Sequence, residues 1–350
     1  TLSLHDALPI CWGYNNHGQV GNGAAPLSAL NPVMIAASAT SLAVGHEASC
    51  VARSDGGQAC WGRTTHAAIG VAFAPANNDA APTPTEVAPS GVVAVAVGKQ
   101  HTCRIADDGT AACVGGDAWG QLGTGTGGAA LAPRWVGAFA ASQLALGEGH
   151  ACAARPNAVW CWGRGDYGQL GTGADDDLQA PREVLPVAVS AIGAGVYHTC
   201  AGSDPLAYCW GYGGYGQLAN GSVASELSPR SISLSGPVTA VGAGTYFTTA
   251  IRAGTEVLGW GNNSRGQLGT NSTTDSNVPL VATNGYSQIT AGYEHTCARS
   301  AAGGVACWGN NSNGQLGLGA NPGPDKKVRD QFAKFEAGGF GHLPVCIAKT

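Results

Sequence analysis

Residues 161–171 read Cys-Trp-Gly-Arg-Gly-Asp-Tyr-Gly-Gln-Leu-Gly, and variants of this stretch return along the whole chain. Its Trp-Gly step recurs every 48 to 53 residues, at Trp12, Trp61, Trp162, Trp210, Trp260 and Trp308, with Val114-Gly115 in the one slot that lacks tryptophan. In most copies a Gly-Gln-Leu-Gly turn follows four residues later, and the second copy has changed to Ala67-Ala68-Ile69-Gly70. A fixed period of about 50 residues predicts an array of seven repeated structural units.

Each unit carries the signals of about four short strands. A proline opens one segment in every unit, at Pro32, Pro84, Pro133, Pro181, Pro229, Pro279 and Pro324. An alternating apolar stretch such as Val93 to Gly98 follows, then His-Thr-Cys or a relative, a glycine turn and the Cys-Trp-Gly strand. Four antiparallel strands in about 50 residues are the size of one β-propeller blade.

These copies resemble the RCC1 (regulator of chromosome condensation) repeat from Ile10 to about Ala348, and the chain is similar to secreted, bacterial-type members of that family. The resemblance implies an all-β, seven-bladed propeller of four-stranded antiparallel blades. It departs from the family pattern at Val114, in the Ala- and Pro-rich loop from Thr64 to Pro84, and around Gly338 to Cys346. We expect a single propeller over residues 10–350, and we exclude residues 1–9, which match nothing later in the chain.

Composition narrows the class of partner. The 55 glycines, 18 prolines and only 11% charged residues suit short strands joined by tight turns. A net charge of −5 argues against nucleic acid, because phosphate binding needs a clustered basic face. No run of 18 apolar residues exists, so we expect no membrane span.

The twelve cysteines follow the repeat. Five units pair one cysteine with another nine or ten residues later: Cys50 with Cys60, Cys103 with Cys113, Cys152 with Cys161, Cys200 with Cys209, and Cys297 with Cys307. In the sixth unit both positions change together, to Thr249 and Gly259. Neighbouring antiparallel strands place such residues opposite each other, close enough for a disulfide. The joint change indicates that each cysteine matters through its mate.

Cys11 and Cys346 remain, at opposite ends of the sequence. The simplest interpretation is that the last strand pairs with the first strand, completes one blade, and is locked there by a Cys11–Cys346 disulfide. The alternatives are buried thiols or zinc ligands, although one pair per blade supplies only two of the four ligands that zinc takes. Six disulfides predict an oxidising compartment, so we expect a secreted, periplasmic or cell-surface protein.

Several motifs have both a functional and a structural explanation, and the structural one is favoured in each case. His101, His150, His198 and His295 recur once per blade, with His342 nearby in the last unit, and could form a metal-binding ring; we expect them instead at blade edges, bonded to neighbouring backbone. The spacings Gly163-x-Gly165-x-x-Gly168 and Gly211-x-Gly213-x-x-Gly216 match a dinucleotide fingerprint but open no helix. Arg164-Gly165-Asp166 and Asp175 to Asp177 are interpreted as exposed loops rather than as adhesion or calcium sites. Because no catalytic motif is present, we expect no enzyme activity, cofactor or metal.

The four residues between Trp-Gly and Gly-Gln vary most, and they fall at one register, hence on one face of the disc. Aromatic and arginine side chains dominate protein interfaces. The candidate partner-binding residues are Tyr14, Arg63, Trp119, Arg164, Tyr167, Tyr212, Tyr215 and Arg265.

The predicted function is therefore that of a monomeric disc that binds a protein through this face. The resemblance implies two further candidates: nucleotide exchange on a small GTPase, and inhibition of an enzyme in the manner of the secreted propeller β-lactamase inhibitors. The exchange activity conflicts with the cysteine pattern, because GTPases work in reducing cytoplasm.

Overall fold

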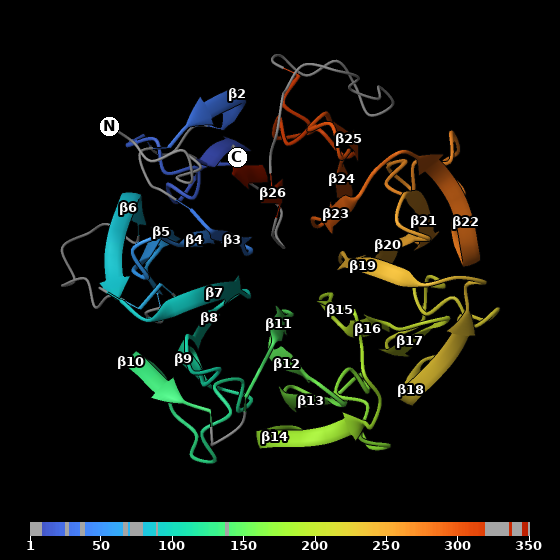
Figure 1. Cartoon of the computed structure of the whole chain (residues 1–350), viewed down its shortest axis with the longest axis horizontal. Coiled ribbons are helices and arrows are strands. Elements are labelled where there is room, and N and C mark those ends of the chain that lie inside the picture. Colours follow the sequence, from blue (N-terminus) through green and yellow to red (C-terminus); the bar gives the residue numbers. More distant parts are fainter. Residues whose placement is uncertain are drawn as a thin grey trace.

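Seven small β-sheets stand around a common axis like the blades of a propeller (Figure 1). The structure is a computed structural model that describes residues 9–24, 28–35, 39–65, 69–70, 80–88, 90–136, 140–318, 336–337 and 345–348. No helix within these residues is long and apolar enough to cross a membrane.

The sheets are numbered here as blades in chain order. Blade 1 contains β1 (Pro9–Gly13), β2 (Ala29–Met34), β26 (Glu336–Ala337) and β27 (Val345–Ala348). Blade 2 contains β3 (Ser41–Val44), β4 (Ala48–Ala52), β5 (Gln58–Arg63) and β6 (Ala80–Ala88); blade 3 contains β7 (Val92–Val97), β8 (His101–Ala106), β9 (Ala111–Gly115) and β10 (Ala130–Trp135). Blade 4 contains β11 (Gln143–Leu146), β12 (His150–Arg155), β13 (Ala158–Gly163) and β14 (Leu178–Leu185); blade 5 contains β15 (Ala191–Ala194), β16 (His198–Gly202), β17 (Leu206–Gly211) and β18 (Glu226–Ser233). Blade 6 contains β19 (Val238–Ala243), β20 (Phe247–Arg252), β21 (Glu256–Gly261) and β22 (Ser276–Asn284), and blade 7 contains β23 (Gln288–Ala291), β24 (His295–Arg299) and β25 (Val305–Gly309).

The expected four-stranded blade is observed in six of the seven sheets. In blade 7 the fourth strand was expected near Pro324, which lies outside the described residues. The other six repeat prolines lie in the outermost strands, where a missing N–H costs no hydrogen bond inside the sheet. The boundary expected at residue 10 moves by one residue, because Pro9 begins β1 and pairs with Ala348.

The Trp-Gly step lies at a bulge in the third strand of the blade. In blade 4 the register between β13 and β14 shifts between Cys161 and Gly163, and Gly163 has a φ of 96°. A side chain is strained at this φ, so glycine is the residue that can follow the tryptophan. The bulge turns the chain out of the sheet and into the variable loop.

Each tryptophan joins its blade to the blade before it. The indole N–H donates to the backbone carbonyl of the glutamine in the preceding Gly-Gln turn. The bonds are Trp12 to Gln315 (2.9 Å), Trp61 to Gln19 (2.9 Å), Trp162 to Gln121 (3.0 Å), Trp210 to Gln169 (2.9 Å), Trp260 to Gln217 (2.8 Å) and Trp308 to Gln267 (3.0 Å). All six indoles are buried, so an unmade bond would leave a polar group without a partner.

The last glycine of the turn makes room for the incoming indole. A Cβ on Gly21 would lie 2.6 Å from the indole nitrogen of Trp61, and a Cβ on Gly171 would lie 2.8 Å from that of Trp210. Where Val114 replaces the tryptophan, a Cβ on Gly70 would lie a comfortable 3.5 Å from the valine side chain. The turn glycine therefore lies unusually close to the residue from the next blade only where that residue is tryptophan.

A second set of glycines lines the axis of the disc. Gly98, Gly147 and Gly244 each follow an innermost strand, and a Cβ on them would lie 2.8, 2.5 and 2.6 Å from the carbonyl oxygen of the corresponding glycine in the next blade. These glycines let the innermost ends of neighbouring blades touch. Along the axis of the disc, the innermost strands enclose a central channel with a cavity of about 240 Å³.

All six expected disulfides are formed. In each, the two cysteines face each other across an antiparallel strand pair with Cα atoms 4.1 or 4.2 Å apart. Thr249 and Gly259 take the same opposed positions in blade 6. In blade 1, Cys11 of β1 pairs with Cys346 of β27, so strands from both ends of the chain share one sheet (Figure 1).

Replacing Cys11 and Cys346 together by serine is expected to lower the free energy of unfolding more than replacing Cys200 and Cys209 together. The first disulfide closes a loop of 335 residues and the second a loop of 9. Chain entropy gives upper bounds of about 5–6 and about 2–3 kcal/mol for the two losses. Guanidinium unfolding without reductant measures both, and equal losses would contradict a special role for the ring-closing bond.

Candidate functional site

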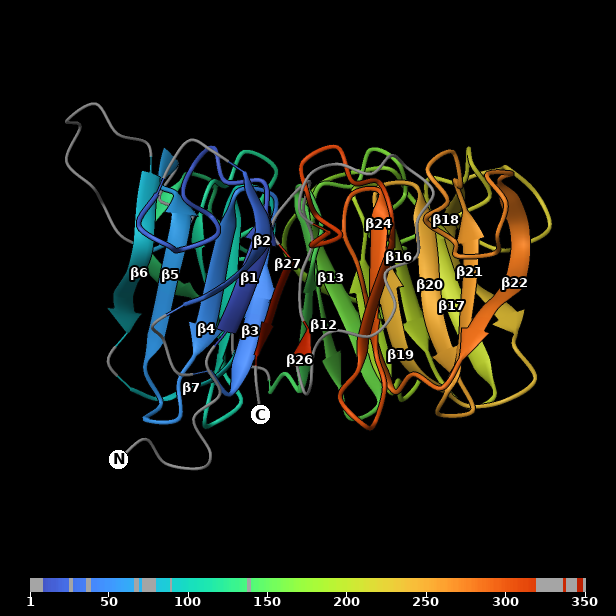
Figure 2. The ribbon, with the colours of Figure 1, turned by 90° about the horizontal axis from the view of Figure 1, so that it is seen from above.

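In blades 3 to 7, where both connections are described, two loops of each blade lie on one face of the disc. One loop joins the first and second strands and is called the inner loop; the other is the Trp-Gly loop after the third strand. Because neighbouring strands alternate in direction, both loops emerge on the same side, called the upper face because it is uppermost in Figure 2. A backbone hydrogen bond joins the two loops, as from Arg164 N to Gly149 O (2.9 Å) and from Tyr212 N to Tyr197 O (2.8 Å).

In six blades, the glutamine of the Gly-Gln turn fixes the last variable residue of the Trp-Gly loop. Its side-chain Oε1 accepts the backbone N–H of the residue two positions earlier. The residues held in this way are His17, Trp119, Tyr167, Tyr215, Arg265 and Asn313, at distances of 2.8 or 2.9 Å. The glutamines are buried, so the same turn holds a residue whose identity varies among these six blades.

Arg164 forms one end of an aromatic cluster. Its guanidinium carbon lies 5.0 Å from the ring centroid of Trp119, 5.5 Å from that of Tyr167 and 5.4 Å from that of Tyr197. These distances are those of cation–π contacts. Asp166 holds the guanidinium from another side, with Nη2 and Oδ2 2.7 Å apart.

Five tyrosines continue the cluster across three blades: Tyr167, Tyr197, Tyr212, Tyr215 and Tyr246, together called the tyrosine strip. Ring centroids are 4.6 Å apart between Tyr167 and Tyr197, 5.7 Å between Tyr167 and Tyr212, and 4.7 Å between Tyr215 and Tyr246. The rings of Tyr212 and Tyr246 are 5.9 Å apart. Tyr167 and Tyr215 are each 38% exposed, so the strip is packed from below and accessible from above.

Five of the eight candidate residues thus come together: Trp119, Arg164, Tyr167, Tyr212 and Tyr215. Sequence analysis missed Tyr197 and Tyr246, which come from the inner loops of blades 5 and 6. A signal was present, since both stand directly before the position that His198 and Phe247 occupy.

Tyr14, Arg63 and Arg265 lie in other contacts. The Tyr14 hydroxyl accepts a hydrogen bond from Asn16 Nδ2 at 2.7 Å. Arg63 Nη1 is 2.6 Å from Glu47 Oε2, and Arg265 Nε is 3.9 Å from Glu294 Oε2. Arg63 is therefore held by an inner-loop glutamate of its own blade, and Arg265 by an inner-loop glutamate of the next blade.

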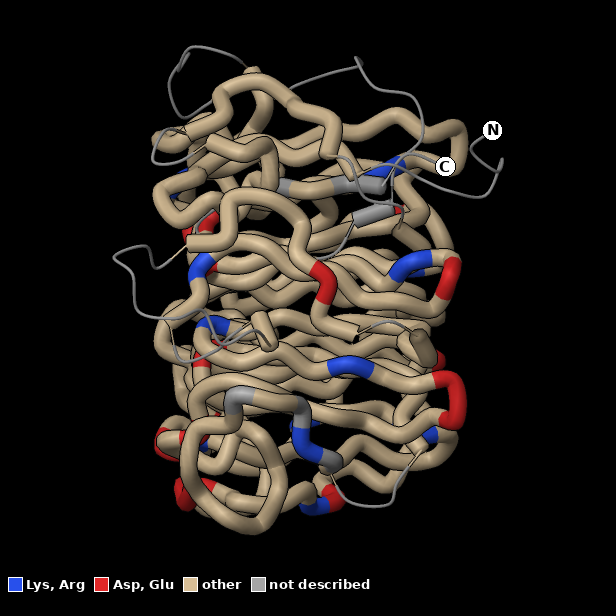
Figure 3. The backbone as a smooth tube through the Cα atoms, turned by 90° about the vertical axis from the view of Figure 1, so that its left-hand side faces the viewer, with Lys and Arg blue, Asp and Glu red and all other residues tan. Residues whose placement is uncertain are grey.

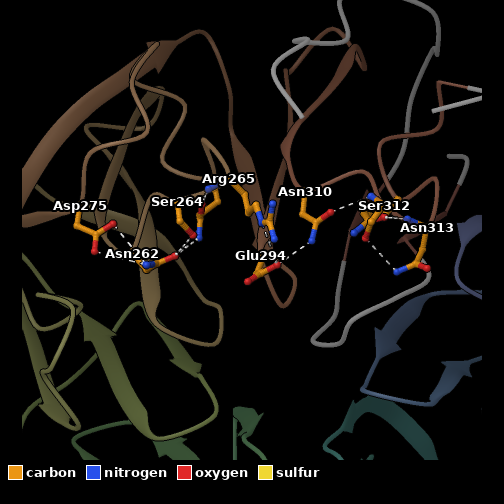
Figure 4. A network of polar contacts seen from close by, with 10 residues as sticks. Asn262, Ser264, Arg265, Asp275, Glu294, Asn310, Ser312 and Asn313 are labelled. Carbon is orange, nitrogen blue, oxygen red and sulfur yellow. Dashed lines mark hydrogen bonds and ion pairs between the residues drawn. The ribbon is translucent and has the colours of Figure 1, made fainter. Parts of the chain in front are cut away.

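Polar side chains cover the upper face where blades 6 and 7 meet (Figure 4). Asn310 Nδ2 donates to Glu294 Oε2 at 2.7 Å, and Asn262 Nδ2 lies 3.4 Å from Asp275 Oδ1. Arg265 extends toward Glu294 from the side opposite Asn310 (Figure 4). The upper face therefore has an aromatic sector over blades 3 to 6 and a polar sector beside it.

Burial and neighbouring groups set the protonation states of two ionisable side chains of this face. Burial alone would raise the pKa of Glu47, but hydrogen bonds from His46 and Arg63 outweigh it and lower the pKa to about 2. Burial, together with nearby tyrosines, raises the pKa of Tyr246 to about 12. Near neutral pH, Glu47 is thus a carboxylate and Tyr246 a neutral phenol.

The centre of the upper face is narrow. The inner loops surround a cavity of about 30 Å³, with Lys99, Glu148, Thr245 and Tyr293 among its lining residues. That volume has room for one or two water molecules. Lys99 Nζ and Glu148 Oε1 are paired at 2.6 Å.

Comparison with known proteins agrees with this geometry. The family model described as the regulator of chromosome condensation (RCC1) repeat matches residues 157–201, 206–251 and 256–299, and a second model of that description matches residues 238–267 and 286–315. Human WBSCR16 superposes with a TM-score of 0.88 at 19% identity, over 98% of this chain and 99% of that chain. Yeast RCC1 (Prp20), crystallised with Kap60, gives 0.86 at 19% identity over 99% and 89%, and Prp20p from Saccharomyces cerevisiae gives 0.83 at 19% identity over 99% and 92%.

This chain has the fold of an RCC1-type β-propeller, with RCC1 repeats matched within residues 157–315. The family models match repeats in the second half of the chain, where the Trp-Gly and Gly-Gln marks are regular. At 19% identity, the superpositions show the shared fold.

The repeated histidines of this RCC1-type propeller join blades. His150 Nε2 lies 2.9 Å from Thr199 Oγ1, and His198 Nε2 lies 2.9 Å from Thr248 Oγ1. The expected partner was backbone, and for His150 and His198 that prediction was wrong, because the partner is a threonine hydroxyl of the next blade. Burial lowers the pKa of both histidines to about 3. No group of three metal-ligating side chains occurs among the described residues, and His342 lies outside them.

The other motifs lie in the Trp-Gly loops of this propeller. Arg164 and Asp166 pair with each other, so the Arg-Gly-Asp tripeptide is bound into its own loop. The loop of Asp175 to Asp177 is exposed, and Asp177 Oδ1 accepts the backbone N–H of Gly165 at 2.8 Å. Both dinucleotide-like spacings lead into turns and then strands β14 and β18.

Replacing His198 by phenylalanine, the residue of blade 6 at this position, is expected to flatten the pH dependence of stability. A histidine with a folded pKa of about 3 and an ordinary pKa of 6.5 is protonated only in the unfolded state between those values. The stability that comes from the neutral imidazole is therefore fully present above pH 6.5 and is lost as the pH falls toward 3. In the variant, the slope of the free energy of unfolding against pH should fall by up to about 1 kcal/mol per pH unit.

Denaturant unfolding between pH 4.5 and 7.5 measures this slope. Thr248→Val is the matched control, because it removes the hydroxyl partner but keeps the imidazole. It should lower stability at every pH and keep the slope. An unchanged slope in His198→Phe would contradict the assignment of a neutral buried imidazole.

Proposed function

We propose that this protein is a non-enzymatic recognition module that binds a protein partner through the aromatic sector of its upper face. The observation that carries the proposal is the continuous cluster of Arg164, Trp119 and the tyrosine strip. Tyrosine, tryptophan and arginine are the side chains most enriched at interface centres. Among the described residues, no other group of aromatic rings has a comparable number of ring contacts.

The turns beneath the cluster support the proposal. Trp119, Tyr167 and Tyr215 are held by the glutamine turn in the free protein. Side chains ordered before binding lose less conformational entropy on association. A rigid turn with variable residues is a suitable base for recognition.

The compartment is part of the proposal. Six disulfides indicate an oxidising environment, and we propose a secreted, periplasmic or cell-surface protein. The crystal structure of Prp20p, which shares the fold, was reported together with the binding properties of Prp20p to Gsp1p and histones. That protein is a precedent for protein binding by the fold. Charged segments of both signs are interspersed along the side of the present disc (Figure 3), which does not favour a nucleic-acid partner.

Site-specific photo-crosslinking tests the proposal. A photoreactive residue is placed at position 215 on the upper face or at the exposed position 157 on the lower face, and each protein is incubated with an extract of the organism that encodes the chain. We expect a discrete protein product from position 215 and none from position 157. Similar products from both positions would contradict the proposal.

The captured protein is then purified and its Kd measured. Tyr167→Ala and Tyr215→Ala should each weaken binding about 10-fold or more, as truncation of an interface anchor does. Asn157→Ala on the lower face is the control and should change the Kd less than about twofold. If the tyrosine variants bind like the control, the aromatic sector is not the interface.

A further inference from the structure

Arg164 shows how this surface binds a cation. Its guanidinium lies over the rings of Trp119, Tyr167 and Tyr197, which come from two Trp-Gly loops and one inner loop. Ring faces carry partial negative charge, so a planar guanidinium can stack on them while its edge bonds elsewhere. Here the edge bonds Asp166. One end of the aromatic sector is thus filled by the chain's own arginine.

The other end has the same kind of surface. Tyr212, Tyr215 and Tyr246 form a group called the tyrosine trio, again from Trp-Gly and inner loops. Their centroids are 6.4 Å apart between Tyr212 and Tyr215, 5.9 Å between Tyr212 and Tyr246, and 4.7 Å between Tyr215 and Tyr246. Among the described residues, cation–π contacts involve other rings and not these three.

The charges on the loops around the trio favour a basic occupant. Among the described residues of the Trp-Gly and inner loops, the lysine and arginine side chains are ion-paired: Arg63 with Glu47, Lys99 with Glu148, Arg164 with Asp166 and Arg265 with Glu294. Exposed acids remain on both sides of the trio, with Asp175 to Asp177 in blade 4 and Asp275 in blade 6. These acids take part in no ion pair among the described residues.

We propose that the tyrosine trio receives an arginine side chain of a protein partner, and that further basic residues of that partner face Asp175 to Asp177 and Asp275. The inference rests on the proposed function and adds the chemistry of the partner: a basic segment with at least one arginine. Arginine is favoured over lysine because a planar guanidinium can stack on a ring and still use its edge for hydrogen bonds. Arg164 on its own three rings provides the geometry within the same surface.

A hexa-arginine peptide is the probe, with the full chain labelled with fluorotyrosine so that each of its 9 tyrosines gives a fluorine resonance. At low salt, the resonances of Tyr212, Tyr215 and Tyr246 should shift together, while those of Tyr14 and Tyr286 should not. Hexa-lysine should bind at least about threefold more weakly, and hexa-glutamate should leave the trio unshifted. Equal binding of hexa-arginine and hexa-glutamate, or shifts outside the trio only, would overturn the inference.

Three substitutions sharpen the test. Tyr215→Leu removes an exposed ring and should weaken hexa-arginine binding about 10-fold. Tyr215→Phe keeps the ring and should stay within about threefold of the parent. Tyr14→Leu is the matched control from the same loop in blade 1 and should have no effect. An equal loss in Tyr14→Leu and Tyr215→Leu would mean nonspecific attraction to an acidic protein.

Failure of this inference can be distinguished from failure of the proposed function. If a partner binds in a Tyr215-dependent way and hexa-arginine does not compete, the arginine assignment is wrong and the recognition face remains. If hexa-arginine binds the trio but no protein depends on Tyr167 or Tyr215, the proposed function is wrong. If sedimentation shows self-association lost in Tyr215→Leu, a second copy of the chain occupies the trio and the inference is also wrong.

Discussion

The hydrogen bond from a tryptophan indole to the glutamine carbonyl of the preceding blade is the contact on which the rest of this propeller depends. Each bond is buried and spans two sheets that share no strand. It needs the indole on one side and a glycine turn that leaves room for it on the other. The ring closes by the same rule, because Trp12 donates to Gln315 across the junction of the chain ends. The Cys11–Cys346 disulfide closes the ring at a second place, between β1 and β27 within blade 1.

The same turn connects the scaffold to the recognition face. The glutamine uses its backbone carbonyl for the indole of the next blade and its side-chain carbonyl for the N–H of the last variable residue in its own loop. The side chain at that position can therefore change without altering the joint between blades. This separation explains why residues as different as Trp119, Tyr167 and Arg265 occupy equivalent places.

The parts of this account that repeat could be predicted from the sequence. The Trp-Gly spacing and the cysteine pairs, which change together at Thr249 and Gly259, indicated the blade, its disulfides and the closure at Cys346. Contacts between repeats could not be read in the same way. The hydroxyl that meets His198 stands 50 residues later, and Glu294 reaches Arg265 from the following inner loop. Tyr197 and Tyr246 join the cluster only because inner and outer loops meet in space.

Exchange of the indole N–H protons tests the central claim most directly. In protein labelled at its 9 tryptophans, NMR under native conditions should show slow exchange for Trp12, Trp61, Trp162, Trp210, Trp260 and Trp308. Trp119, on the upper face, should exchange quickly. The decisive resonance is that of Trp12: exchange as slow as that of Trp162 and Trp210 means that the ring is closed by the same bond as every other joint. Rapid exchange at Trp12, with the other five protected, would contradict the account.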